Sequence, residues 1–188
     1  MKQIEGGVCA ATGFTAAGVY CGIRKNKEKK DLALIYSEKK AACACVYTQN
    51  LVKGAPIAVT KQNVADGYAS AIICNSGNAN TCNANGVEIA EAMCNLLGAA
   101  LNIPASDVVV ASTGVIGKTL EIEPIASGIP LAIQSLGDDS DGAASAIMTT
   151  DLKKKEIAVE FSVGTTVCKI GGIAKGSGMI QPNMATML

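Results

Sequence analysis

The sequence predicts a mixed α/β protein, and three observations carry that prediction. Short apolar runs with the length and alternation of β-strands recur along the chain, and three segments carry apolar residues at helical spacing. Hydrophobic residues make up 49% of the 188 residues and charged residues only 17%, which excludes disorder and allows a sizeable core. Aromatic residues are only 3% of the chain, so this core must consist of small aliphatic side chains.

Five short apolar runs are predicted to be β-strands. Val, Ile and Ala dominate them, and β-branched residues are typical of strands. The expected strands cover residues 31–36, 42–48, 56–60, 70–75 and 107–112.

A β-hairpin is expected over residues 156–170, with Gly164 at its turn. Apolar residues alternate with small or polar ones along its first arm, at Ile157, Val159, Phe161 and Val163. This period of two predicts that one face of the arm is buried and the other solvated.

The first two predicted helices follow a helical apolar spacing. One covers residues 86–101, where Asn85 and Glu88 resemble a capping pair at the start. Its apolar stripe consists of Ala90, Met93, Leu97 and Leu101. The other covers about residues 118–135 and is expected to be broken near Pro124 and Pro130.

A third helix is expected from residue 141 to about residue 150, after the acidic residues Asp138, Asp139 and Asp141. Acidic side chains before a helix are stabilised by its dipole, so this cluster is predicted to cap the helix rather than to bind a metal ion. The charged runs 24–30 and 153–155 are predicted to be solvated turns.

Charge and histidine content exclude several function classes. Lys and Arg number 16 and Asp and Glu number 16, so no general attraction to nucleic acid or to anionic membranes follows. The chain has no histidine, which excludes Ser-His-Asp and Cys-His catalysis and histidine-ligated zinc within the chain itself. An enzyme built on this chain needs another base.

The eight cysteines form no CxxC pair, which argues against zinc and iron–sulfur sites, and no metal site is predicted. Most lie among apolar residues and are expected to be reduced, buried thiols. The N-terminus has no signal-peptide core, and no apolar run approaches the roughly 18 residues of a membrane span. These features predict a cytoplasmic protein.

Three polar, glycine-containing segments interrupt the apolar pattern. Residues 75–80 have the composition of an Asx-rich turn. Residues 112–117 follow a predicted strand and precede a predicted helix, a junction whose backbone N–H groups can hold an anion or a developing oxyanion. Residues 171–186 have the composition of a flexible loop, in which Lys175 is a candidate anion-binding group. The chain then stops on an apolar run at Leu188, as expected for a piece of something longer.

Five motifs in consistent order resemble the ornithine acetyltransferase family, also called the bifunctional glutamate N-acetyltransferase (ArgJ) family. They are GFTAAGVYCGI at 13–23, NSGNAN at 75–80, STGVIG at 112–117, MTTD at 148–151 and KGSGMIQPNMATML at 175–188. The resemblance runs from about Gly13 to Leu188. Two departures, at 81–84 and at Leu152, concern loops rather than the proposed nucleophile.

The resemblance implies a proenzyme that cleaves itself between Ala185 and Thr186. Residues 1–185 would be the α-subunit portion of an α/β, DmpA/ArgJ-like fold, with β-sheets sandwiched between helical layers, and residues 186–188 would begin the β subunit that completes it. Thr186 would become an N-terminal nucleophile whose own α-amine, with a usual pKa of about 7.7–8.0, serves as the base. Such a nucleophile needs no histidine.

The implied reaction is acetyl transfer from N-acetylornithine to glutamate through an acetyl-threonine ester, a step of arginine biosynthesis. By resemblance, Thr113 and Gly114 line the oxyanion hole, and Thr149, Lys175 and Thr186 bind the substrate, with Lys175 facing its α-carboxylate. No cofactor is implied, although acetyl-CoA is a candidate second donor.

The implied partners are the β subunit from the same precursor, in an α2β2 heterotetramer, and the small molecules N-acetylornithine, ornithine and glutamate. Neither nucleic acid nor a membrane is implied. Two alternatives stay open: an N-terminal-threonine amidohydrolase or aminopeptidase of the same fold, in which water resolves the acyl-enzyme, and a truncated, non-catalytic module.

Overall fold

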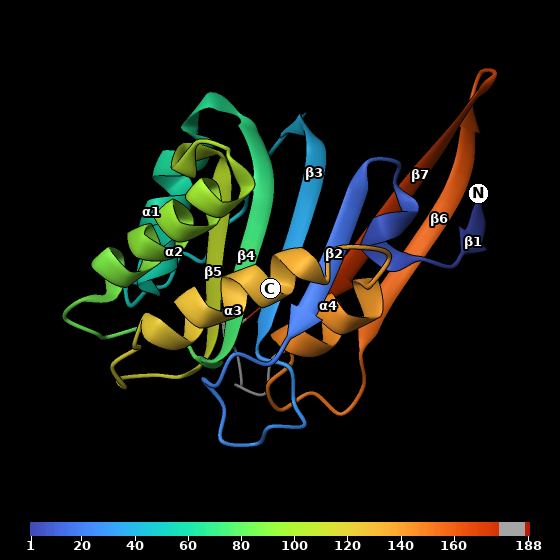
Figure 1. Ribbon diagram of the computed structural model, residues 1–188. Coiled ribbons are helices and arrows are strands. Elements are labelled where there is room, and N and C mark those ends of the chain that lie inside the picture. Colours follow the sequence, from blue (N-terminus) through green and yellow to red (C-terminus); the bar gives the residue numbers. More distant parts are fainter. Residues whose placement is uncertain (177–186) are drawn as a thin grey trace.

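Two β-sheets form the framework of the chain (Figure 1). The computed structural model describes residues 1–176 and 187–188. Within them the larger sheet consists, in spatial order, of β2 (Phe14–Val19), β3 (Leu32–Ala42), β4 (Tyr68–Asn78) and β5 (Val108–Val115). The smaller sheet consists of β1 (Lys2–Ile4), β6 (Lys155–Val163) and β7 (Thr166–Ala174).

Helices cover both faces of the larger sheet (Figure 1). The α-helices are α1 (Ala55–Asn63), α2 (Gly86–Leu101), α3 (Glu123–Gln134) and α4 (Ser140–Ile147). Short 3-10 turns lie at Gly7–Ala10, Val64–Asp66 and Ala105–Asp107. Strands β2, β3 and β4 pair antiparallel, whereas β4 and β5 pair parallel and are joined by the α2 crossover. The carboxyl ends of β4 and β5 therefore lie side by side.

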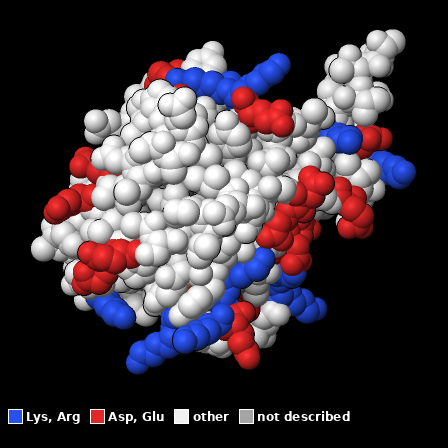
Figure 2. Space-filling model, in the orientation of Figure 1, with Lys and Arg blue, Asp and Glu red and all other residues white. Residues whose placement is uncertain are grey.

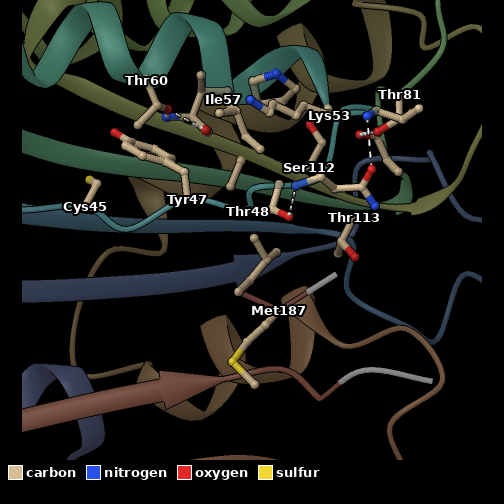
Figure 3. Close-up of a pocket in the computed structure, with 18 of the residues that line it drawn as sticks. Cys45, Tyr47, Thr48, Lys53, Ile57, Thr60, Thr81, Ser112, Thr113 and Met187 are labelled. Atoms are coloured by element: carbon tan, nitrogen blue, oxygen red, sulfur yellow. Dashed lines mark hydrogen bonds between the residues drawn. The ribbon is translucent and has the colours of Figure 1, made fainter. Parts of the chain in front are cut away.

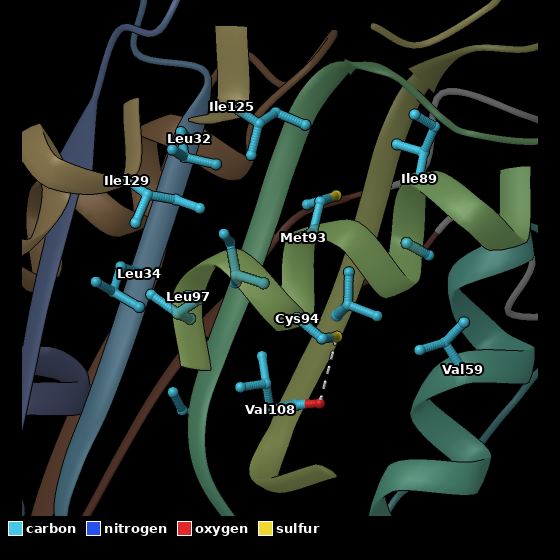
Figure 4. Packing of buried hydrophobic residues seen from close by; sticks show 14 of the residues in the cluster. Leu32, Leu34, Val59, Ile89, Met93, Cys94, Leu97, Val108, Ile125 and Ile129 are labelled. Atoms are coloured by element: carbon cyan, nitrogen blue, oxygen red, sulfur yellow. Dashed lines mark hydrogen bonds between the residues drawn. The ribbon is translucent and has the colours of Figure 1, made fainter. Parts of the chain in front are cut away.

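The main core lies between the larger sheet and helices α1, α2 and α3 (Figure 4). Leu34, Ile73 and Val110 are neighbours across three strands and point to this face. The α2 stripe packs against them, and its members Met93 and Leu97 are fully buried. The expected helix over residues 86–101 and its stripe are thus confirmed, although Asn85 makes no side-chain capping bond.

The opposite face of the larger sheet packs against α4 through small side chains. Ala33 and Cys74 on the sheet contact Ala143 and Ala146 of the helix. Gly18 of β2 must be glycine, because a Cβ there would overlap the backbone of α4. The N-terminus of α4 is capped by Asp139, which accepts a hydrogen bond of 3.0 Å from the Gly142 N–H, so the expected acidic cap is confirmed.

Two expected strands are wrong. Residues 56–60 belong to α1, where Pro56 occupies the first turn and Thr60 faces the edge strand β5. The Thr60 hydroxyl donates to the Val110 carbonyl at 2.7 Å and accepts from the Val110 N–H at 3.0 Å. A short apolar run fits a strand or a buried helix equally well, and length does not separate them here. Residues 43–48 form no strand, because β3 ends at Ala42 and an irregular segment follows.

The remaining expected elements are confirmed with adjusted boundaries. The predicted strands at 31–36, 70–75 and 107–112 correspond to β3, β4 and β5. Helix α3 starts at Glu123, with Pro124 in its first turn, and continues through Pro130 instead of breaking there. A proline in the first turn costs little, because its missing N–H has no partner within the helix.

The hairpin β6–β7 turns at Gly164, which has φ of +60°. Its alternation is observed, but the ends of the apolar face are exposed. Ile157 is 55% exposed and Val163 is 61% exposed, whereas the intervening Ala158 is buried. Val159 and Phe161 on the same face are half-buried, so among the described residues the apolar face is covered only along the middle of the arm, and the expectation that one whole face would be buried is wrong. Among the described residues, no helix is long and apolar enough to cross a membrane.

Candidate active site

A pocket of about 540 Å³ opens along the edge strand β5 (Figure 3). Its walls are the end of β5, helix α1, the irregular segment that follows β3, and the last two residues of the chain. Thr113 and Ser112 lie at one end and Cys45 and Tyr47 at the other, while Met187 approaches from the opposite side (Figure 3).

The carboxyl ends of β4 and β5 carry Thr113 and Gly114 into this pocket. Ser76 of β4 is paired with Thr113, and Gly77 with Gly114. The ladder is irregular from Gly77 onward, and Gly114 has φ of +135°. A Cβ at Gly114 would overlap the backbone of Gly77 and its neighbour. Only glycine fits so close to the backbone of Gly77, so backbone atoms and no side chain line the pocket at Gly114.

A buried polar network holds these strand ends together. The Ser112 hydroxyl donates to Asn75 Oδ1 at 2.6 Å, and Asn75 Nδ2 donates to the Asn78 carbonyl at 2.9 Å. Asn80, in a left-handed conformation, donates from its amide to the Gly86 carbonyl at 2.7 Å. β4 continues to Asn78, and Asn78 Oδ1 accepts from the Asn80 N–H at 2.8 Å, so the expected Asx turn is present at the end of the segment 75–80, with its asparagines buried.

The segment 112–117 is not a strand–turn–helix junction. Thr113 and Gly114 belong to the end of β5, and α3 begins only at Glu123. The N-terminus of α3 therefore does not lie at Thr113 and Gly114, whereas the first turn of α1, with Gly54 and Pro56, lines the same pocket. Oxyanion stabilisation by Thr113 and Gly114 would have to come from backbone and hydroxyl groups at the strand end.

Lys175 directly follows β7 and is only 3% exposed. Its N–H donates to the Leu188 carbonyl at 3.0 Å, and Leu188 lines the pocket together with Thr113. Its Nζ donates to the Gly176 carbonyl at 2.8 Å. Burial lowers the pKa of Lys175, while the nearby Asp151 and Cys74 act in the opposite direction.

Thr149 lies outside that pocket. It lines a second cavity of about 290 Å³ together with Arg24, Lys29, Lys30 and Asp151. The structure thus brings Thr113, Gly114 and Leu188 together, places Lys175 next to Leu188, and places Thr149 in a separate cavity. The predicted cleavage site, Ala185–Thr186, lies outside the described residues.

Two polar residues near Thr149 were missed in the sequence. Arg24 belongs to a run expected to be a solvated turn, yet it is half-buried, and its guanidinium donates to Ser76 Oγ at 2.8 Å and to the Met148 carbonyl. Asp151 has a side chain only 2% exposed. It accepts hydrogen bonds from the Gly176 N–H at 2.6 Å, from Lys155 Nζ at 2.8 Å and from the Thr149 N–H at 3.3 Å. Met148 lies 124 positions from Arg24, and Gly176 lies 25 positions from Asp151, so these two contacts are beyond the reach of local patterns.

The cysteines are poor candidates for a nucleophile. Burial raises the pKa of Cys43 to about 11 and the pKa values of Cys21 and Cys74 to about 12, so these thiols stay protonated at neutral pH. All eight are free thiols, but only Cys74 and Cys94 are buried, five are partly exposed and Cys82 is exposed, so the expectation that most of them are buried is wrong. Within the described part of the chain, no group of three or more Cys, Asp or Glu residues is arranged to hold a metal ion.

We expect Asp151 to make the protein lose stability in acid. Burial would raise the pKa of this carboxyl group, but the hydrogen bonds from Lys155, Gly176 and Thr149 outweigh burial and lower the pKa to about 2. Because the pKa is lower in the folded state than the unfolded value of about 3.9, the ionised carboxylate stabilises the fold at pH values above about 3.9. This contribution to the free energy of unfolding, about 2 kcal/mol, is lost as the pH falls toward 2. Urea unfolding at pH 6 and at pH 3 should show a smaller difference in the Asp151→Asn variant.

Asp141→Asn is the control, because Asp141 forms an exposed pair with Lys154. Equal pH slopes in the two variants and the parent would contradict the assignment.

Comparison with known proteins decides the family. The chain matches the family described as the ArgJ family over residues 15–188. The chain belongs to the ArgJ family. It is 46% identical over 190 residues to the arginine biosynthesis bifunctional protein ArgJ of Caldanaerobacter subterraneus subsp. tengcongensis. The matched region includes all of this chain but only 47% of that protein. A chloroplastic ArgJ from Oryza sativa subsp. indica is 43% identical over 196 residues, with 42% of its length covered. The chain thus spans about half the length of the curated ArgJ relatives.

Two solved structures share the ArgJ fold of this chain. An ArgJ from Bacillus halodurans superposes with a TM-score of 0.87 at 36% identity, covering 99% of this chain and 97% of that one. An ornithine acetyltransferase from Mycobacterium tuberculosis, solved with ornithine, superposes with a TM-score of 0.86 at 34% identity, covering 100% and 99%. The expected ArgJ-like α/β fold is therefore confirmed.

Proposed function

We propose that this chain is the α-subunit portion of an acetyltransferase that moves an acetyl group from N-acetylornithine to glutamate. One observation carries the proposal: Met187, the residue bonded to Thr186, lines the same pocket as Thr113 and Gly114. A nucleophile at position 186 would be bonded directly to a residue that lines the pocket of the proposed oxyanion hole. The similarity to an ornithine acetyltransferase structure agrees with this substrate class.

Cleavage of the Ala185–Thr186 bond would create the nucleophile. The chain lengths of the relatives support it: this chain covers nearly all of two solved ArgJ-family chains but only about half of the curated proteins. Such lengths are expected if a precursor is cut into two parts. Residues 1–185 would then be the α portion, and 186–188 the start of the β portion.

The chemistry proceeds in two half-reactions. The neutral α-amine of Thr186 takes the proton of its hydroxyl, and Oγ attacks the acetyl carbonyl of N-acetylornithine. The C–N bond breaks, ornithine leaves with the proton, and an acetyl ester remains on Thr186. The amine of glutamate then attacks this ester, N-acetylglutamate leaves and the hydroxyl is restored. Thr113 and Gly114 would stabilise the oxyanion in both steps, where one such donor is typically worth about 2.7–4 kcal/mol.

The partly uncovered apolar face of the β6–β7 hairpin supports a β subunit from the same precursor as the partner, within an α2β2 assembly. Its exposed side chains include Ile157, Val163 and Ile170, and Figure 2 shows the projecting tip of the hairpin without charge. Apolar strips of this kind are typical of protein interfaces. We place the assembly in the cytoplasm, in agreement with the small-molecule substrates; the rice relatives carry the designation chloroplastic.

Incubation with N-acetylornithine and glutamate tests the function. The full-length precursor should give N-acetylglutamate and ornithine in equal amounts, while release of acetate instead would identify a hydrolase. A second arm with acetyl-CoA as donor tests for the second activity. A precursor that is never cleaved and still transfers acetyl groups would overturn the Thr186 mechanism.

The Lys175→Met variant should mainly weaken substrate binding. Lys175 is buried beside the Leu188 carbonyl, and its ammonium is the candidate partner of the substrate α-carboxylate. Loss of a charge-assisted hydrogen bond worth about 1.5–3 kcal/mol should raise the KM for N-acetylornithine roughly 10–100-fold. Steady-state kinetics measure this, with Lys169→Met on the exposed face of β7 as the control. An unchanged KM would count against the role of Lys175.

A further inference from the structure

The carboxylate of Asp151 joins two segments that are distant in sequence. One is the segment 148–151, which contains Thr149, and the other is the end of β7, which contains Lys175. Asp151 binds the N–H of Thr149 itself and the N–H of Gly176, the residue directly after Lys175. The resemblance assigns Thr149 and Lys175 to substrate binding. The carboxylate of Asp151 thus contacts the backbone of Thr149 and the backbone directly after Lys175.

The chemistry of these contacts requires a carboxylate. Oδ1 accepts from the Gly176 N–H and from Lys155 Nζ, and Oδ2 accepts from the Thr149 N–H. All three partners are donors, so a side chain that only accepts matches them. At 2% exposure, an ionised carboxylate needs such partners to compensate for the loss of water.

The ion pair with Lys155 does not explain this arrangement. Lys155 belongs to neither segment, so its ion pair with Asp151 does not join them, although it helps to lower the pKa of the carboxyl group. The shortest of the three bonds, 2.6 Å, is the one to the Gly176 amide. The backbone amides are thus the contacts that give the carboxylate its position.

A second contact fixes the other end of the segment 148–151. The Arg24 guanidinium donates to the Met148 carbonyl and to Ser76 Oγ, and Ser76 is paired with Thr113 across the β4–β5 ladder. Thr149 therefore lies between two anchored neighbours, in the cavity that it lines with Arg24 and Asp151.

We propose that Asp151 is a positioning residue that holds Thr149 and Lys175 in a fixed relation to each other for substrate binding. This inference rests on the proposed function. Asp151 acts through the two backbone amides that it binds. Displacements of about 1 Å in a binding site can cost roughly 100-fold in rate, so the loss of this connection should be measurable.

The test compares three variants of the full-length precursor. Asp151→Asn keeps the size of the side chain but puts an NH₂ group where one acceptor stood. Lys155→Met removes the ion pair and leaves both amide contacts. Asp141→Asn removes an acid whose lysine pair lies on the solvent side of α4 and touches neither segment. The readouts are KM and kcat for N-acetylornithine and hydrogen exchange of the amides of Thr149 and Gly176.

The expected result is specific to Asp151. Asp151→Asn should raise KM about 10-fold or more with a smaller effect on kcat, and both amides should exchange about 10-fold faster. Lys155→Met should change KM less than about threefold, and Asp141→Asn should match the parent. If Asp151→Asn does not fold, Asp151→Glu replaces it with the same expected rise in KM.

Three results would overturn the proposal: parent-like kinetics in Asp151→Asn, an equal loss in Lys155→Met, or failure of both Asp151 variants to fold, since the carboxylate would then be holding the fold itself. If the parent protein transfers no acetyl group, the proposed function is wrong. The positioning role of Asp151 is then tested by the hydrogen-exchange rates alone. Unchanged exchange in Asp151→Asn would then refute the positioning role.

Discussion

Replacing Thr186 by alanine should abolish both self-cleavage and acetyl transfer. One hydroxyl serves both reactions in the proposed mechanism, so its removal leaves the Ala185–Thr186 bond intact and leaves no atom to carry the acetyl group. Loss of a nucleophile in a unit of this kind typically costs about 10⁴–10⁶ in kcat. Intact mass and N-terminal sequencing of the expressed full-length gene measure the first effect, and the transfer assay measures the second.

The control for this experiment is Thr165→Ala, at the exposed turn of the β6–β7 hairpin. It removes the same hydroxyl from a site far from the pocket and should be cleaved like the parent. Thr186→Ser should also be cleaved, because it keeps a hydroxyl next to the new α-amine. Cleavage that persists in Thr186→Ala would refute the assignment of the nucleophile.

The Gly114→Ala variant should have the second-largest effect. The added Cβ would overlap the backbone of Gly77 and Asn78, and φ of +135° lies outside the range that an alanine readily adopts. The end of β5 would have to shift, and with it the backbone that we assign to the oxyanion hole. Loss of one oxyanion donor typically costs about 10²–10³ in kcat, and we expect a loss of this size.

Gly117→Ala provides a matched control in the same segment. Gly117 also has positive φ, at +73°, but nothing lies within 4 Å of a Cβ added there. This variant should lose only about 1 kcal/mol of stability and keep its transfer rate. Circular dichroism and thermal unfolding show whether each variant folds. Equal kcat values in the two variants would contradict the assignment of Gly114.

Local sequence patterns correctly predicted the elements whose apolar spacing fits only a helix or only a strand. Helix α2 shows a long apolar stripe, and its predicted bounds agree with the structure. The β6–β7 hairpin has a clear alternation and a glycine turn. Helix α1 was predicted as a strand because nine residues show too little periodicity, and its identity depends on contacts between Thr60 and a strand about 50 residues away.

The candidate site was accessible from the sequence only in part. The motifs named Thr113, Gly114, Thr149 and Lys175, and the structure places the first two in one pocket with Leu188. That Thr149 lies in a different cavity follows from the path of the chain after α4, which no motif encodes. Arg24 was missed because its partner Met148 is remote in sequence, and Asp151 stood in the motif 148–151 without a role, because its bond to the Gly176 amide depends on the fold.

The uncovered strip on the β6–β7 hairpin has a practical consequence for the laboratory. Ile157, Val163 and Ile170 are each more than half exposed, and water-facing aliphatic strands are sites of self-association. Produced alone, this polypeptide should bind dyes such as ANS and precipitate on concentration. Co-expression with the proposed β subunit should prevent this, and recovery of monodisperse material only in that case would support the β subunit as the cover of the strip.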